Sequence, residues 1–367
     1  MKLSRTARLT GLALSSTLLL AACGTDEQRP VASAEDTVDS GITCAEGGLT
    51  AAGSSAQKNA VDEWVKAYQG ACPGATINYQ SAGSGAGIEQ FIAGTTAFAG
   101  SDSALKDDEV AQAAARCKTG PAINLPMVIG PVAIAYNLDG VDELVLDAPA
   151  LAKIFSGRIT TWDDAALQAL NPDASLPSSR IQPFVRSDES GTSDNVQKYL
   201  EAAAPAEWTF GDGKKFNGPG NQSAAKSDGV TQAVISTPGA VTYVEGSFAE
   251  NAGLSVAKIS TGASEPVELT GETAGEAVEA ATVTGTGNDL SLKLDYATKD
   301  EGAYPIVLVT YEIVCEKGTP ADQLELLTSF LSFTSSDEGQ DLLEDVGYAP
   351  LPSSIRKKVE AAVAVLS

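Results

Sequence analysis

Residues 181–203 read IQPFVRSDESGTSDNVQKYLEAA, and this stretch combines three kinds of signal. Residues 181–185 form a short apolar run that is typical of a buried strand. Residues 186–192 are small, hydroxylated or charged, as in a loop. From residue 191 to residue 203 the spacing of apolar side chains is helical. The stretch therefore predicts a strand, a tight loop and a helix, in that order.

The same alternation of strands and helices extends over most of the chain and predicts parallel sheets covered by helices. The part after the N-terminal region, about 320 residues, is long enough for two lobes with separate cores. Residues 260–290 are rich in Thr, Gly, Ala and Glu and predict weakly structured surface, whereas 123–137 predicts a long strand interrupted by Gly130-Pro131. Further strands are expected at 49–52, 75–80, 98–101, 240–244 and 305–314. Further helices are expected at 58–68, 87–94, 106–116, 148–155, 163–170, 223–237, 321–333, 337–345 and 353–366.

The N-terminus has the pattern of a signal peptide, predicted to span residues 1–22. Three cations in residues 1–8 precede an apolar stretch at 9–20 that is too short for a membrane-spanning helix. The sequence Leu20-Ala21-Ala22-Cys23 resembles the bacterial lipobox, in which the signal is cut before a cysteine that carries a lipid. An ordinary secretory signal with an incidental cysteine is the alternative. Residues 23–45 are acidic and small and predict a flexible tether.

Charge and composition exclude several classes of function. The formal net charge is −24, and loss of the three signal-peptide cations makes it about −27, so nucleic acid and anionic lipid headgroups are poor partners. The chain has no histidine, which excludes a Ser-His-Asp or Cys-His catalytic unit and makes most transition-metal sites improbable. We expect neither a bound metal nor a cofactor.

Four cysteines remain after Cys23, an even number that suggests two disulfides in an exported chain. Four cysteines allow three connectivities. We favour Cys72–Cys117 with Cys44–Cys315. No CxxC or Cys/His spacing indicates a zinc site.

Three loops share one composition, with glycine and hydroxyl side chains between a strand and a helix. They are 52–56, 81–87 and 186–192, of sequence AGSSA, SAGSGAG and RSDESGT. Unpaired N–H groups at a helix N-terminus suit an oxyanion, and Ser or Thr adds a rotatable donor. Taken singly, each loop is more often a helix N-cap. The third also supplies Arg186, whose guanidinium matches phosphate oxygens unless it merely pairs with Asp188 on the surface.

A fourth element, Gly100-Ser101-Asp102, adds an acid at a strand end. An ionised carboxylate only accepts hydrogen bonds, so Asp102 would favour an anion that retains a proton. Phosphate carries an O–H near neutral pH and sulfate does not. Asp102 as an N-cap of the segment that leads to Lys106 is the alternative.

In this order the four loops resemble the phosphate-binding protein of the bacterial phosphate-specific ABC transporter. The resemblance covers about residues 48–365, and its specific elements are the Arg-x-Asp-x-Ser-Gly-Thr loop and the Gly-Ser-Asp turn. Supporting stretches are IFSG at 154–157, TWDD at 161–164, LNP at 170–172, PGAVTYV at 238–244 and YPI at 304–306. The resemblance implies phosphate contacts from Ser55, the Ala56 amide, Ser84, Asp102, Arg186, Ser190, Gly191 and Thr192, with Asp188 orienting Arg186. Many relatives have Thr-Phe in place of Ser55-Ala56, so an aromatic wall of the cleft is lost here.

The resemblance also implies a type II periplasmic-binding-protein fold, in which two α/β lobes joined by two crossing strands close around the ligand. The expected crossings lie near 135–137 and 302–305. Residues 46–136 and 304–367 would form the first lobe and residues 137–303 the second. The implied role is extracytoplasmic phosphate capture by a lipid-anchored monomer that delivers its ligand to membrane permease subunits.

Two other readings stay open. The first is a binding protein for another oxyanion, such as sulfate, molybdate or phosphonate. The second is a secreted phosphatase-like enzyme that uses Ser190, although histidine, a Gly-x-Ser-x-Gly elbow and an evident metal cluster are lacking.

Overall fold

The computed structural model describes residues 42–367. The predicted signal peptide of residues 1–22, Cys23 and nearly all of the predicted tether lie outside the described residues. No helix in the described part has both the length and the apolar character needed to cross a membrane.

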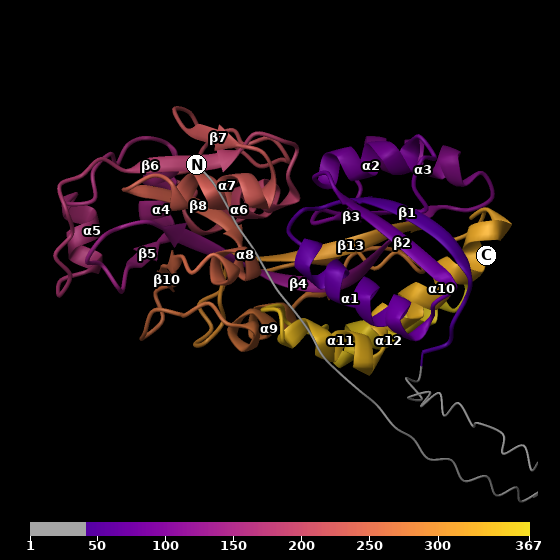
Figure 1. Ribbon diagram of the computed structural model, residues 1–367. Coiled ribbons are helices and arrows are strands. Elements are labelled where there is room, and N and C mark those ends of the chain that lie inside the picture. Colours follow the sequence, from indigo (N-terminus) through magenta and orange to yellow (C-terminus); the bar gives the residue numbers. More distant parts are fainter. Residues whose placement is uncertain (1–41) are drawn as a thin grey trace, which may run out of the picture. The chain divides into compact units, whose positions relative to one another are not determined.

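A first strand group consists of β1 (Gly47–Gly53), β2 (Ala75–Ser81) and β3 (Phe98–Ser101), and both β2 and β3 pair with β1 in parallel. Helices α1 (Lys58–Ala71) and α2 (Ser84–Ile92) connect these strands, as the alternating pattern predicts. One face of α1 is buried through Val61, Trp64 and Tyr68, which explains its helical spacing of apolar residues. In Figure 1, α2 and α3 (Asp107–Cys117) lie above this strand group and α1 lies below it.

Two long strands, β4 (Ala122–Tyr136) and β13 (Val307–Cys315), run through the centre, and every residue of both is buried. They pair antiparallel over residues 122–131 of β4, after which β4 pairs with β8 (Ala240–Glu245) from Val132 onward. The predicted interruption at Gly130-Pro131 is therefore wrong. The strand continues through both residues, with Pro131 still opposite Val307 of β13, and it pairs with β8 from Val132 onward.

A second strand group consists of β6 (Gln182–Arg186), β7 (Gln222–Ala224) and β8, all parallel. Figure 1 shows helices α4, α6 and α7 around these strands. The main hydrogen-bonded path through the sheet is β2-β1-β3-β13-β4-β8-β6-β7, and one further short strand pairs with β4. The prediction of parallel sheets thus holds for the two flanks and is wrong for the antiparallel centre.

The remaining elements follow the chain around these strands. The helices are α4 (Ala148–Phe155), α5 (Ala165–Leu170), α6 (Gly191–Ala203), α7 (Lys226–Ile235), α8 (Gly246–Asn251), α9 (Gly271–Glu279), α10 (Ala321–Ser335), α11 (Asp337–Glu344) and α12 (Ser353–Val363). The short strands are β5 (Val145–Asp147), β9 (Ser255–Val256), β10 (Lys258–Ser260), β11 (Thr282–Val283) and β12 (Leu292–Lys293).

The segment 260–290 was expected to be weakly structured, and this expectation is wrong for α9. Thr270 caps this helix by accepting from the Thr273 amide at 3.1 Å, and Ala274, Ala277 and Val278 are buried beneath it. The buried side chains are small, so the apolar spacing of α9 is weak in the sequence.

The boundaries between the two lobes stay a prediction. The change of partner within β4, between Pro131 and Val132, lies a few residues before the expected boundary after Tyr136. On the return path the Val132 amide donates to the Ile306 carbonyl at 2.8 Å, close to the expected crossing at 302–305.

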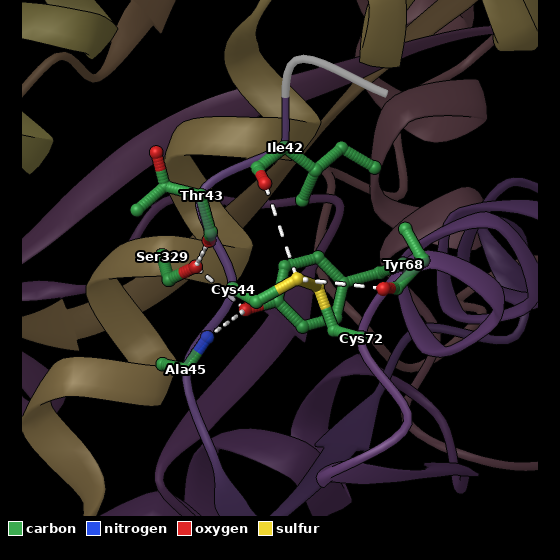
Figure 2. Close-up of a disulfide and its surroundings, with 8 residues drawn as sticks. Ile42, Thr43, Cys44, Ala45, Tyr68, Cys72 and Ser329 are labelled. Atoms are coloured by element: carbon green, nitrogen blue, oxygen red, sulfur yellow. Dashed lines mark hydrogen bonds between the residues drawn. A yellow bond between two sulfur atoms is a disulfide. The ribbon is translucent and has the colours of Figure 1, made fainter. Parts of the chain in front are cut away.

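The disulfides are Cys44–Cys72 and Cys117–Cys315, so the favoured pairing of Cys72 with Cys117 and Cys44 with Cys315 is wrong. The strand register explains the observed pairing. Gly47 of β1 lies opposite Ala75 of β2, which places Cys44, three residues earlier, near Cys72. Cys315 lies opposite Ala122, only five residues after Cys117. Figure 2 shows the first bridge beside Tyr68, whose hydroxyl accepts from the Ala45 amide at 3.3 Å.

Candidate oxyanion-binding site

The four predicted loops all begin at the carboxyl ends of parallel strands, the edge at which α/β sheets bind ligands. They follow β1, β2, β3 and β6.

The first loop, residues 54–57, joins β1 to α1 and is buried. Ser54 Oγ accepts from the Ala56 amide at 3.0 Å, so the amide that was predicted to bind the anion has a partner within its own loop. Ser55 Oγ lies 2.9 Å from Ser227 Oγ and accepts from the Ser227 amide at 3.1 Å. The first loop therefore contacts the N-terminus of α7 directly.

Ser84, the first residue of α2, connects the second loop to two other predicted parts of the site. Its hydroxyl donates to Asp102 Oδ2 at 3.3 Å and accepts from the amides of Asp102 and Gly191, both at 3.2 Å. Gly83 before it has a φ of 98°, and a side chain there would lie 2.6 Å from Asp188 Oδ2. Glycine is thus required by both backbone conformation and space.

The third loop holds Arg186 against Asp188. The guanidinium donates from Nε to Oδ1 at 2.8 Å and from Nη2 to Oδ2 at 2.5 Å, and only 2% of the arginine side chain is exposed. Asp188 Oδ1 also accepts from the Lys226 amide at 2.8 Å. Burial alone would raise the pKa of Asp188, but the hydrogen bonds and charge of Arg186 outweigh it and lower that pKa. Arg186 is therefore a fixed cation inside the protein rather than a surface side chain.

Asp102 is buried at the end of β3 and accepts from several hydroxyls. Thr310 Oγ1 on β13 donates to Asp102 Oδ1 at 2.8 Å. Burial raises the pKa of Asp102, and hydrogen bonds from Ser54 and Thr310, the charge of Arg186 and the hydrogen bond from Ser84 oppose this rise. The carboxylate thus lies among groups from the first, second and third loops. The alternative in which it only caps a helix is not supported, since the N-cap position of α3 is Lys106, whose amide donates to Glu109 Oε2 at 2.8 Å.

The start of α6 closes the site from the other side. A Cβ on Gly191 would lie 2.6 Å from Asp102 Cβ and 2.7 Å from Ser84 Oγ, so only glycine permits this approach. Ser190 caps α6 by accepting from the Ser193 amide at 3.3 Å, which leaves its own O–H free to donate elsewhere. Thr192 Oγ1 is buried and has no hydrogen-bond partner among the described residues. A buried unpaired hydroxyl costs about 1–3 kcal/mol, a cost that an anion's oxygen would remove.

Three residues of the site were missed by sequence reasoning. Ser227 touches the first loop, and its only signal was a position near the start of a predicted helix. Asn195 Nδ2 donates to the Asp102 carbonyl at 2.6 Å. Tyr243 O–H accepts from the Arg186 amide at 3.2 Å and lies 2.6 Å from Ser193 Oγ. Side chains that contact other site residues rather than a ligand do not form a sequence motif that could identify them.

The arrangement combines one fixed guanidinium, several hydroxyl and amide donors, and one buried carboxylate acceptor. Residues 42–367 contain no group of three His, Cys, Asp or Glu side chains placed to hold a metal ion. The chemistry of this set of groups suits a small oxyanion that keeps a proton. It offers no activated nucleophile, because no base is positioned against Ser190 within the described residues.

Comparisons with known proteins find relatives over nearly the whole length of the chain. Residues 30–338 match the family described as PBP superfamily domain. Phosphate-binding protein PstS 3 of Mycobacterium tuberculosis (strain ATCC 25618 / H37Rv) is 44% identical over 371 residues, which cover 99% of each chain. Phosphate-binding protein PstS 2 of the same strain is 41% identical over 372 residues and 100% of each chain.

Among solved structures, the phosphate-binding protein from Stenotrophomonas maltophilia superposes with a TM-score of 0.66 at 21% identity, over 86% of this chain and 94% of that chain. At this identity the similarity speaks for the fold alone. The predicted two-lobed α/β fold class is confirmed.

Proposed function

Since this chain belongs to the PBP superfamily and, within it, to the family of PstS phosphate-binding proteins, we propose that it binds inorganic phosphate between its two strand groups. It is a binding protein and not an enzyme. The proposed ligands are the predicted ones, Ser55, Ala56, Ser84, Asp102, Arg186, Ser190, Gly191 and Thr192, and Asp188 orients Arg186.

The position of Asp102 is the observation that carries the proposal. A buried carboxylate within a set of donors accepts the proton of a phosphate O–H and repels an anion that has none. The Asp102 carboxylate already accepts from Thr310 and Ser84, which hold it in place for a further donor. The site therefore recognises its anion at short range, although the chain carries a formal net charge of −24.

Contacts between the two strand groups indicate how binding would favour closure. The Gly85 amide donates to the Glu189 carbonyl at 3.0 Å, and Ser55 contacts Ser227. A ligand held by both groups stabilises the conformation in which these contacts form. We assign the closed protein the role of delivering phosphate to the permease subunits of an ABC transporter.

Phosphate is expected to stabilise the protein against heat. At a phosphate concentration 100-fold above Kd the gain in free energy of unfolding is about 2.7 kcal/mol, which raises Tm by several degrees. Differential scanning calorimetry with phosphate or sulfate at equal ionic strength measures this. An equal rise with both anions would contradict the proposal.

The N-terminal part of the proposal is lipid anchoring at Cys23 on the outer face of the cell membrane, supported by the lipobox-like sequence at residues 20–23. Cells that express the full chain are fractionated, and the N-terminal peptide of the membrane form is weighed by mass spectrometry. A diacylglyceryl mass on Cys23, and release of Cys23→Ser into the soluble fraction, are expected. An unmodified Cys23 in the membrane fraction would exclude the anchor.

A further inference from the structure

Glu312 is a buried acid on β13 that the phosphate site does not use. Its side chain is 3% exposed, and it forms no ion pair with any Lys or Arg in residues 42–367. An isolated carboxylate is costly to bury, since the charge loses its hydration without gaining a counter-charge. This position therefore requires a physical explanation.

The strand pairing places Glu312 beside the amide of Gln57. Glu312 lies directly opposite Gly100 on β3, so their Cα–Cβ directions share one face of the sheet. A Cβ on Gly100 would lie 2.1 Å from Gln57 Nε2 and 2.5 Å from Tyr79 Oη. The side chains of Gln57 and Tyr79 therefore occupy the space over Gly100, next to Glu312.

The hydrogen bonds fix which way the Gln57 amide points. Tyr79 has one hydroxyl proton, which it donates to the Ser54 carbonyl at 2.8 Å. The bond of 3.0 Å between Tyr79 Oη and Gln57 must then be donated by Gln57 Nε2. Gln57 Oε1 consequently faces away from Tyr79 and needs a donor of its own.

Two acceptor atoms are left without a donor at this place. Gln57 Oε1 and Glu312 Oε2 are both buried and have no hydrogen-bond partner among the described residues. As a carboxylate, Glu312 could only accept, and both atoms would stay unpaired. One proton on Glu312 satisfies both, because the acid O–H then donates to the amide carbonyl.

We infer that Glu312 is protonated in the folded protein and pairs, as a neutral carboxylic acid, with the Gln57 amide, making it a positioning residue for phosphate. The pair supports Gln57 and Tyr79, and Tyr79 holds the Ser54 carbonyl at the start of the first loop. Ser55 and Ala56 belong to the same loop. The inference rests on the proposed phosphate site but concerns a different residue, one that touches no ligand.

The surroundings of Glu312 favour the neutral form. Burial raises the pKa of Glu312 to about 8; the neighbouring Gln57 amide opposes the rise and the negative charge of Asp102 adds to it. The other titratable group that faces it is the Tyr79 phenol, whose own pKa is raised by burial and by Glu312. No cation opposes these effects among the groups that act on Glu312. Ionisation at higher pH would place a second negative charge behind Asp102 and break the pair with Gln57.

The test compares phosphate affinity of the full chain and of Glu312→Gln between pH 6.5 and pH 9.5. A glutamine can donate to Gln57 Oε1 and cannot ionise. Both proteins are therefore expected to bind alike at low pH, and the wild type is expected to lose about tenfold more affinity at high pH. Glu312→Met, which fills similar space without a donor, is expected to bind more weakly at every pH. Glu325→Gln removes an exposed carboxylate of α10 and should follow the wild type throughout.

Two measurements without phosphate keep this inference separate from the proposed function. The infrared difference spectrum of wild type minus Glu312→Gln at pH 7 is expected to show the carbonyl band of a protonated carboxylic acid. Glu245, whose pKa burial also raises to about 8, contributes equally to both proteins and cancels. Folding of the wild type takes up a proton at Glu312, and folding of Glu312→Gln does not. As the pH rises from 5 to 8, the wild type should therefore lose stability relative to Glu312→Gln, by about a tenfold change in the unfolding equilibrium per pH unit. Wild type that fails to bind phosphate would overturn the proposed function only. Equal pH profiles and an unchanged infrared band would overturn the role of Glu312.

Discussion

Replacing Arg186 with alanine is expected to weaken phosphate binding by about 100- to 1,000-fold, corresponding to about 3–4 kcal/mol. Two effects add up. The anion loses charge-assisted hydrogen bonds from a guanidinium that Asp188 holds in place at 2.8 and 2.5 Å. The Asp188 carboxylate, no longer neutralised, then repels the bound anion. Calorimetric or equilibrium-dialysis Kd values measure the loss.

The controls separate position from charge. Arg180→Ala removes an exposed cation and should leave Kd within about twofold, because exposed charges are screened. Arg186→Lys keeps the charge without the fork-shaped donor and is expected to lie between wild type and Arg186→Ala. Circular dichroism of each variant checks the fold. An affinity of Arg186→Ala equal to that of Arg180→Ala would show that Arg186 is not a ligand.

Replacing Asp102 with asparagine is expected to reduce the preference for phosphate over sulfate by at least about tenfold. In the wild type the sulfate oxygens face a carboxylate and gain no donor, an unpaired arrangement that costs about 1–3 kcal/mol. The asparagine amide can donate to sulfate. Its side-chain carbonyl can still accept from Thr310, whose hydroxyl lies 2.8 Å from Asp102 Oδ1 in the wild type. Phosphate binding should weaken and sulfate binding should strengthen.

Lowering the pH should reduce the preference for phosphate over sulfate, as the Asp102→Asn substitution does. Burial raises the pKa of Asp102 above its ordinary value, and a protonated carboxyl becomes a donor. The preference for phosphate is therefore expected to fall as the pH falls through that raised pKa. Asp108→Asn removes an exposed carboxylate of α3 with the same change of charge and should keep the wild-type preference. An unchanged ratio of the two Kd values in Asp102→Asn would exclude the proton-acceptor role.

The local parts of the site could be predicted from sequence because they are short and contiguous. The RSDESGT loop after β6 contains a strand end, an arginine with its partner aspartate and a helix cap within seven residues. The separate elements were also predictable, since apolar spacing identified α1, α6 and the buried strands β3 and β13.

What the sequence could not supply depends on register and on long-range contacts. The disulfides follow from the alignment of β1 with β2 and of β4 with β13, and nothing in the spacing of cysteines encodes that alignment. Ser227 reaches Ser55 across 172 positions. Glu312 and Gln57 meet only because Gly100 leaves room for them, so an acid within an apolar strand had no visible partner.

Isothermal titration of the wild-type protein with phosphate and with sulfate, in one buffer at pH 7, tests the central claim most directly. The account predicts one phosphate per chain and a Kd for sulfate at least about 100-fold weaker, because one buried acceptor faces an anion without a proton. Sulfate binding as tight as phosphate binding would contradict it.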